Sequence, residues 1–180
     1  MNTAGAISYL FGTLLDLYIT AVMLRLLLQW VRADFYNPVC QFLVLITNPL
    51  LIPLRRVVPS IGSLDTASVV LMLVLELAGV WLLTRLMGLE MAGQAMVIYA
   101  LVKLILTLLW TYFFLIIAMV ILSWVGPRAR HPIVPLIIQL TDPVLAPIRR
   151  VLPVLGGFDL SPLVALIGIR FLIVLLPTSF

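Results

Sequence analysis

The sequence predicts an all-α membrane protein with four transmembrane helices, arranged as two repeats of the same topology. Three observations predict this fold class. Of the 180 residues, 64% are hydrophobic and only 10% are charged, whereas a soluble domain carries about 25% charged residues. The mean hydropathy is +1.26, which is typical of a chain that lies mostly within the bilayer. A phrase rich in proline and arginine also occurs twice.

Long apolar segments predict the spans, since about 20 apolar residues are needed for a helix to cross the hydrocarbon core. The expected spans run over about 6–31, 66–84, 95–125 and 161–177. The segments 38–59 and 132–153 are also apolar, but they are short and broken by proline. We therefore expect these two segments to lie at the membrane interface.

The repeated phrase reads NPLLIPLRRVVPSIG at 48–62 and DPVLAPIRRVLPVLG at 142–156. Other identities follow at the same offset of 94: Tyr18 with Tyr112, Trp30 with Trp124, Pro38 with Pro132, and Asp65 with Asp159. A constant offset indicates a tandem duplication, with units at 1–90 and 91–180. Each unit is a helix, an interfacial segment and a second helix. Because two spans return the chain to its starting side, the units have parallel topology, and a pseudo-two-fold axis along the membrane normal is expected.

The basic residues predict the orientation of the chain. Most of them follow the first or the third span: Arg32, Arg55, Arg56, Arg128, Arg130, Arg149 and Arg150. The positive-inside rule places these loops in the cytoplasm and both termini outside. The net charge of +4 is therefore explained by topology and anionic lipid rather than by nucleic acid.

The phrase predicts a short kinked helix at the interface. Asn48 and Asp142 are good N-cap residues, and each precedes a proline suited to the first helical turn. A second proline four residues later disfavours a long regular helix. The apolar positions form one stripe with the arginines at its edge and flank, as in interfacial amphipathic helices.

The arginine pairs are the first candidate site. A guanidinium group matches the geometry of phosphate and carboxylate, so we expect binding of lipid or of a partner at Arg55, Arg56, Arg149 and Arg150. Asp65 and Asp159, which follow the glycine turns, could pair with these arginines within the chain. The simpler alternative is that the arginines only fix topology and anchor the helix.

Ionisable residues within the spans form a second candidate site: Asp16, Arg25, Glu76 and Arg170. Such residues are costly in a membrane and often functional. Glu76 and Arg170 hold equivalent positions in the two units, so we expect them to approach one another. One alternative is a buried pair that fixes the helix register; the other is an ion or proton path through Asp16 and Glu76.

Signals for an enzyme are weak. The only histidine, His131, and the only cysteine, Cys40, cannot supply a usual metal-ligand set, and no common catalytic motif occurs. We expect no enzymatic activity, no cofactor and no metal.

Two copies of [ND]-P-x-L-x-P-[IL]-R-R-V-x-P, each followed by a glycine turn, resemble the bacterial YggT family, also called YlmG. The second copy continues as GGFDLSPLVALIGIRFL, close to the family pattern, whereas the first departs from it at LDTAS, where Ser-Pro is lost. The resemblance implies a small protein of the bacterial inner membrane. It also implies links to osmotic or ion homeostasis and, in plastids, to cytochrome assembly, but no agreed molecular activity.

We therefore expect a non-enzymatic membrane protein that supports envelope organisation, homeostasis or complex assembly. Its partners would be anionic lipid headgroups, a membrane protein or a second copy of the chain. One alternative is an ion-conducting or ion-coupled transporter of K⁺ or H⁺ that uses Asp16, Glu76 and Arg170. Another is an assembly factor for a membrane cytochrome or a different complex.

Overall fold

The computed structural model describes residues 3–62, 64–125, 131–152 and 159–177. Within these ranges the chain is helical: α1 Thr3–Trp30, α2 Pro38–Arg55, α3 Thr66–Leu86, α4 Gly93–Val125, α5 Ile133–Val151 and α6 Ser161–Leu175. Arg128, Arg130 and the second glycine turn at 156–157 lie outside the described residues. The all-helical class predicted from the sequence is confirmed.

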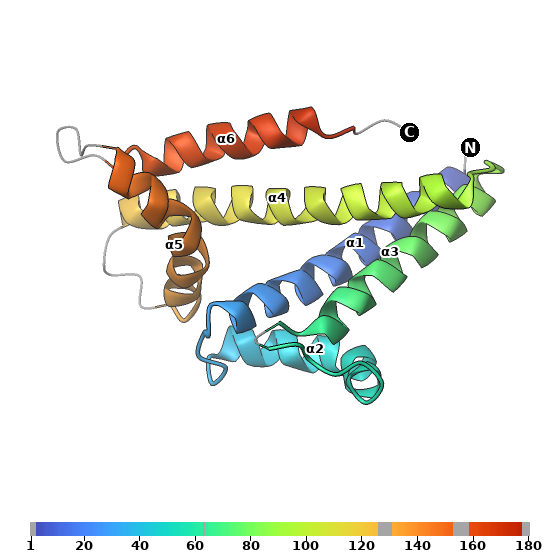
Figure 1. Ribbon diagram of the computed structural model, residues 1–180, viewed down its shortest axis with the longest axis horizontal. Coiled ribbons are helices and arrows are strands. Elements are labelled where there is room, and N and C mark those ends of the chain that lie inside the picture. The colour runs from blue at the N-terminus through green and yellow to red at the C-terminus, as the bar shows by residue number, and fades with distance from the viewer. Residues whose placement is uncertain (1–2, 63, 126–130, 153–158, 178–180) are drawn as a thin grey trace.

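The two units have the same internal architecture. In the first, α1 packs against α2 and α3, and α2 packs against α3; in the second, α4, α5 and α6 make the same three contacts. Figure 1 shows that α1 and α4 run in the same direction and that α3 and α6 return toward the end where α1 begins. The units therefore have the parallel topology that the duplication predicts.

The contact between the units is one-sided. α3 packs against α4, but the matching pair, α6 and α1, has no comparable contact. In Figure 1, α1 and α3 lie near α4 at the end where α1 begins and diverge from it toward the end of α1, so a wedge opens between α1 and α4. The units therefore share the topology that a two-fold relation requires, but the contact between them is not two-fold symmetric.

Within the part of the chain that the structure describes, four helices are long and apolar enough to cross a membrane: α1, α2, α3 and α4. This makes the chain a multi-pass membrane protein. The set differs from the four predicted spans in one member, because it includes α2 and lacks α6, which covers most of the span predicted at 161–177. α6 has only 15 residues, which at 1.5 Å per residue is shorter than a typical hydrocarbon core. In Figure 1, however, α6 runs alongside α4, whereas α2 and α5 lie across the ends of the long helices. The arrangement thus favours α2 and α5 as interfacial helices.

The interfacial helices begin earlier than predicted. α2 begins at Pro38, where the Oδ1 atom of Asn37 accepts a hydrogen bond of 2.9 Å from the Val39 backbone N–H. Asn48 and Asp142 are therefore not N-caps, because they lie inside α2 and α5. The helix continues through its two internal prolines because one buried stripe, which includes Leu43, Thr47 and Leu51 in α2, is packed on both sides of Pro49. Each proline removes a single helical hydrogen bond.

Candidate functional site

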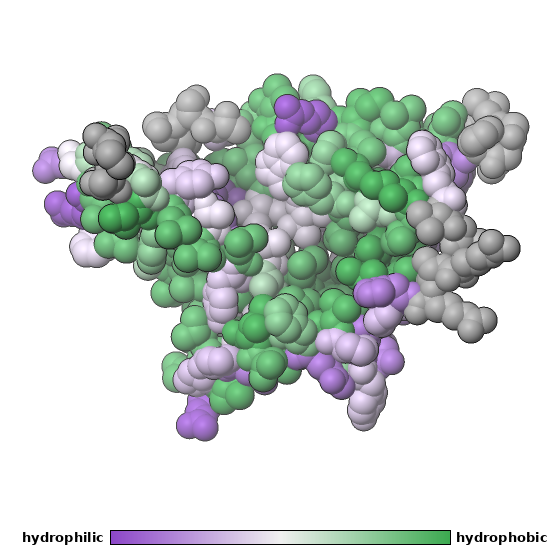
Figure 2. Space-filling model, turned by 180° about the vertical axis from the view of Figure 1, so that it is seen from behind, coloured by the Kyte–Doolittle hydropathy of each residue, from purple (hydrophilic) through white to green (hydrophobic). Residues whose placement is uncertain are grey.

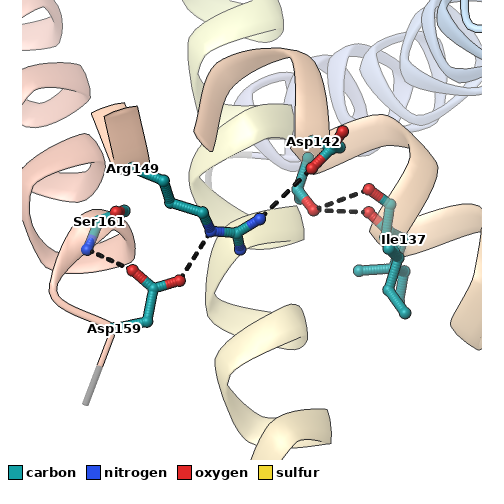
Figure 3. Close-up of polar contacts among 7 residues, drawn as sticks. Ile137, Asp142, Arg149, Asp159 and Ser161 are labelled. Atoms are coloured by element: carbon teal, nitrogen blue, oxygen red, sulfur yellow. Dashed lines mark hydrogen bonds and ion pairs between the residues drawn. The ribbon is translucent and has the colours of Figure 1, made fainter. Parts of the chain in front are cut away.

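Arg149 joins the end of α5 to the start of α6 (Figure 3). Its Nε donates to Asp159 Oδ2 at 2.8 Å, and its Nη1 donates to Asp142 Oδ1 at 3.3 Å. Asp159 Oδ1 also accepts a hydrogen bond of 2.9 Å from the backbone N–H of Ser161, the first residue of α6. The three side chains therefore hold the two helices together.

Arg55 makes the equivalent junction in the first unit, where it is more deeply buried. Its Nη2 donates to Asp65 Oδ2 at 2.5 Å, and the Ser68 hydroxyl donates to the same oxygen at 2.6 Å. The Asp65 side chain is only 1% exposed, whereas that of Asp159 is 42% exposed. We call these two junctions, Arg55 with Asp65 and Arg149 with Asp159, the arginine turns.

Both turn aspartates are held in the charged form. Burial by itself would raise the pKa of Asp65, but hydrogen bonds from Arg55 and Ser68 outweigh it and keep the pKa below its usual range. The pKa of Asp159 is also lowered, because hydrogen bonds from Ser161 and Arg149 outweigh the effect of burial. The turns are therefore ionic at neutral pH.

The second arginine of each pair behaves differently from the first. Arg56 and Arg150 are exposed, and neither forms a salt bridge to any residue that the structure describes. Each precedes an exposed valine, Val57 at 78% and Val151 at 82%. The pairing that the sequence offered for Asp65 and Asp159 thus occupies one arginine per unit, and the other arginine is exposed.

Apolar side chains are exposed on the two helices at whose ends these arginines lie. Figure 2 shows a face covered mainly by hydrophobic side chains, with hydrophilic ones gathered toward its periphery. Exposed large apolar residues occur on α2 and α5 themselves: Phe42, Leu45, Leu50, Ile52, Ile133 and Ile138. A cation beside exposed hydrocarbon is the surface expected at the boundary between acyl chains and headgroups.

Lys103 joins the two intramembrane acids, which come from different helices. Its Nζ lies 2.6 Å from Asp16 Oδ1 and 3.0 Å from Glu76 Oε2. The Glu76 side chain is fully buried, whereas that of Asp16 is 48% exposed. The expected approach of Glu76 to Arg170 is therefore wrong, because Lys103 of α4 takes the position beside Glu76. Lys103 lies eight residues into the third expected span, and its charge there is the sequence feature that could have indicated this contact.

Arg170 interacts with an aromatic ring instead. Its guanidinium carbon lies 5.4 Å from the centroid of the Trp110 ring, within the range of a cation–π interaction. Trp110 is the repeat equivalent of Asp16, and Arg170 is the equivalent of Glu76. In the first unit these two positions therefore hold the acids Asp16 and Glu76, which Lys103 bridges. In the second unit they hold Trp110 and Arg170, which form a cation–π contact.

Arg25 belongs to the first arginine turn rather than to the intramembrane cluster. It is 5% exposed, and its Nη1 donates to the Thr47 hydroxyl at 2.5 Å. It also interacts electrostatically with Arg55 and Asp65. The sequence predicts Arg25 to be one of the intramembrane charges, because it does not show that α2 packs against α1 and brings Thr47 to Arg25.

A cavity of about 670 Å³ fills the wedge between α1 and α4. Its lining is mainly apolar and includes residues of α2 and α5; Asp16 and Lys103 contribute the charges. The starts of α2 and α5 meet through a hydrogen bond of 2.6 Å from Asn37 Nδ2 to the carbonyl oxygen of Pro132. Among the described residues, no group of three His, Cys, Asp or Glu side chains could hold a metal ion.

Comparison with known proteins supports the duplication. A sequence model of the family described as CCB3/YggT matches residues 4–86 and again 98–180. An uncharacterized protein of Pseudomonas aeruginosa is 43% identical over 96% of this chain and 87% of its own length. "Uncharacterized protein in proC 3'region" of Vibrio alginolyticus is 43% identical over 93% of the chain and 91% of its own length. "Uncharacterized protein YggT" of Escherichia coli K12 is 38% identical, with coverages of 91% and 84%. No solved structure matches the chain.

Proposed function

The chain belongs to the CCB3/YggT family, and we propose that it is a membrane protein that binds the phosphate groups of anionic lipids through Arg56 and Arg150. One observation carries this proposal. In both units the first arginine is engaged by an aspartate, while the second is exposed, has no salt bridge to a described residue and precedes an exposed valine. A phosphate oxygen is the acceptor that a guanidinium group at this depth would meet.

The arginine turns position these free guanidinium groups. Because Arg55 and Arg149 tie the ends of α2 and α5 to the next helix, the neighbouring arginine is held at a defined place. Each basic group near an anionic surface contributes about 1 kcal/mol. Two such groups suit reversible contact with abundant lipid better than tight capture of one molecule.

In this proposal the arginine turns face the cytoplasm of a bacterial inner membrane, and both termini lie outside. Lipid binding would set the depth of α2 and α5 in the interface and couple the bundle to the surrounding bilayer. Such a protein would support envelope organisation or osmotic and ion homeostasis without catalysing a reaction.

The test compares two pairs of substitutions in purified protein. Arg56→Ala with Arg150→Ala should reduce the retention of phosphatidylglycerol, measured by native mass spectrometry, while thermal stability stays unchanged. Arg55→Ala with Arg149→Ala should reduce stability instead. Arg85→Ala is a control, because this exposed arginine lies at the opposite end of α3. Unchanged retention of phosphatidylglycerol in the Arg56 and Arg150 variant would refute the proposal.

The ion-coupled alternative draws on the contact of Lys103 with Asp16 and Glu76 beside the cavity. The ammonium group occupies the position that a bound cation would take, which argues against a K⁺ site there. Flux of K⁺ or H⁺ into proteoliposomes that is lost in Glu76→Gln would favour this alternative. Assembly of a membrane cytochrome or of another complex would use the exposed arginines for a protein acid, and co-purification of that complex would identify it.

A further inference from the structure

One face of α6 is exposed, whereas the equivalent face of α3 is buried or half-buried. In α3 the side chains at Val69, Leu73, Glu76, Leu77 and Val80 are buried or half-buried. Their equivalents are all exposed: Leu163 at 56%, Ile167 at 62%, Phe171 at 65% and Val174 at 71%, together with Arg170. These positions follow a spacing of three and four residues, so they form one face of the helix. We call this face the α6 stripe.

A stripe of α1 is uncovered in the same way relative to α4. In α4 the side chains at Ala100, Lys103, Leu104, Thr107, Leu108 and Thr111 are buried or half-buried. Their equivalents in α1 are exposed: Ala6, Tyr9, Leu10, Thr13, Leu14 and Leu17. Tyr9 is 77% exposed and Leu10 is 60% exposed. We call this face the α1 stripe.

These two stripes are the counterparts of the contact between the units. α3 packs on α4, and Glu76 meets Lys103 there. The α6 stripe is equivalent to the covered face of α3. The α1 stripe is equivalent to the face of α4 that carries Lys103, part of which, at Thr107 and Thr111, also lines the cavity. Each copy therefore presents both halves of a contact that it already makes once within itself.

We propose that a second copy of the chain covers these stripes, with α6 of one copy packed on α1 of the next. This contact repeats the packing of α3 on α4. In lipid such packing draws on van der Waals contact and hydrogen bonds between helices rather than on the hydrophobic effect. A hydrogen-bonding group at the centre of the contact would therefore favour it.

Arg170 and Tyr9 supply that group. They are the repeat equivalents of Glu76 and Lys103, so the contact places Arg170 beside Tyr9 of the partner subunit. A tyrosine hydroxyl can accept a hydrogen bond from a guanidinium group. Without this partner, Arg170 is exposed and has the ring of Trp110 on one side. A charged group at that depth in lipid is costly, which favours the assembled state.

The contact is head-to-tail, since it joins two different surfaces. Each copy has one α6 stripe and one α1 stripe, so all stripes are covered only if the assembly closes into a ring, and a two-fold symmetric dimer is the smallest such ring. Arg56 and Arg150 are not part of either stripe. The assembly and the lipid sites can therefore fail independently.

Thiol cross-linking in native membranes tests the contact. In a Cys40→Ala background, Leu10→Cys and Ile167→Cys are placed on separately tagged copies and co-expressed, then treated with a short bifunctional thiol reagent. The expected product is a covalent dimer that carries both tags. Either substitution alone should give much less covalent dimer than the pair, because the contact joins Leu10 to Ile167 of the partner subunit rather than to its own equivalent.

Ile7→Cys with Leu172→Cys is the matched control pair. Both residues are exposed, at 64% and 46%, but their equivalents Leu101 and Ala78 are exposed as well. They therefore lie off the stripes. Equal cross-linking of this pair would overturn the proposal, as would covalent dimers formed to the same extent by Ile167→Cys alone. Single-molecule photobleaching of the unmodified chain in bilayers should show two or more steps per spot, and single steps throughout would also overturn it.

Discussion

Replacement of Lys103 by methionine should destabilise the protein strongly, because Lys103 is the counter-charge of a buried carboxylate. Glu76 is fully buried, and the ion pair of 3.0 Å with Lys103 is its one polar side-chain contact among the described residues. Loss of one partner from a buried pair costs about 3–5 kcal/mol. Lys103→Met should lower the free energy of unfolding by this amount.

Two further variants separate the buried contact from the exposed one. Asp16→Asn removes the half-exposed acid, and such a pair contributes about 0–1 kcal/mol. Lys103→Met combined with Glu76→Leu should recover most of the lost stability, because no uncompensated charge then remains in the core. Unfolding would be followed by steric trapping in bicelles. The reasoning is refuted if Lys103→Met is no more destabilising than Asp16→Asn, or if the double variant is no better than the single one.

Three other outcomes are expected. Arg55→Ala should lower the free energy of unfolding by about 1.5–3 kcal/mol, since it leaves Asp65 without its charged donor, whereas Arg56→Ala should change it by less than about 0.5 kcal/mol; equal effects would contradict the division between the two arginines. The lowered pKa of Asp65 and Asp159 means that both turns stabilise the fold above the unfolded value of 3.8 and lose that contribution as the pH falls further. Asp65→Asn should therefore flatten the acid limb of a stability profile measured between about pH 2 and pH 6, and an unchanged limb would contradict this. Asn37→Ala should cost about 1 kcal/mol, because it removes the N-cap of α2, and it should also weaken protection of the Pro132 region in hydrogen exchange; unchanged protection would show that the link between α2 and α5 is dispensable.

The arginine turns were predictable because they are local. Arg55 and Asp65 are ten residues apart, as are Arg149 and Asp159, and so short a separation between one helix end and the next helix start keeps such residues near each other. The sequence did not indicate which arginine of each pair the aspartate would engage. That choice depends on the direction in which the last turn of α2 or α5 faces, which the internal prolines alter.

The partner of Glu76 within the membrane does not follow from the symmetry of the repeat. Equivalent positions suggested Glu76 with Arg170, but Lys103 is the residue that reaches Glu76. A contact of Glu76 with Arg170 would require the two units to face each other across an axis. The units instead meet mainly through α3 and α4, so a residue of α4 with no charged equivalent in α1 becomes the partner.

The sequence by itself determined that this chain is a helical, duplicated, multi-pass membrane protein, because composition and a constant repeat offset depend on no particular packing. It also determined the parallel topology, and it offered the pairing of arginine with aspartate at each turn as one of two alternatives. Only the tertiary structure decided the partner of Glu76, the position of Arg25 beside Thr47 and the one-sided contact between the units. Lys103 and Asp16 are 87 residues apart, and such contacts depend on the angle and rotation at which separate helices pack, which spacing along the chain does not specify.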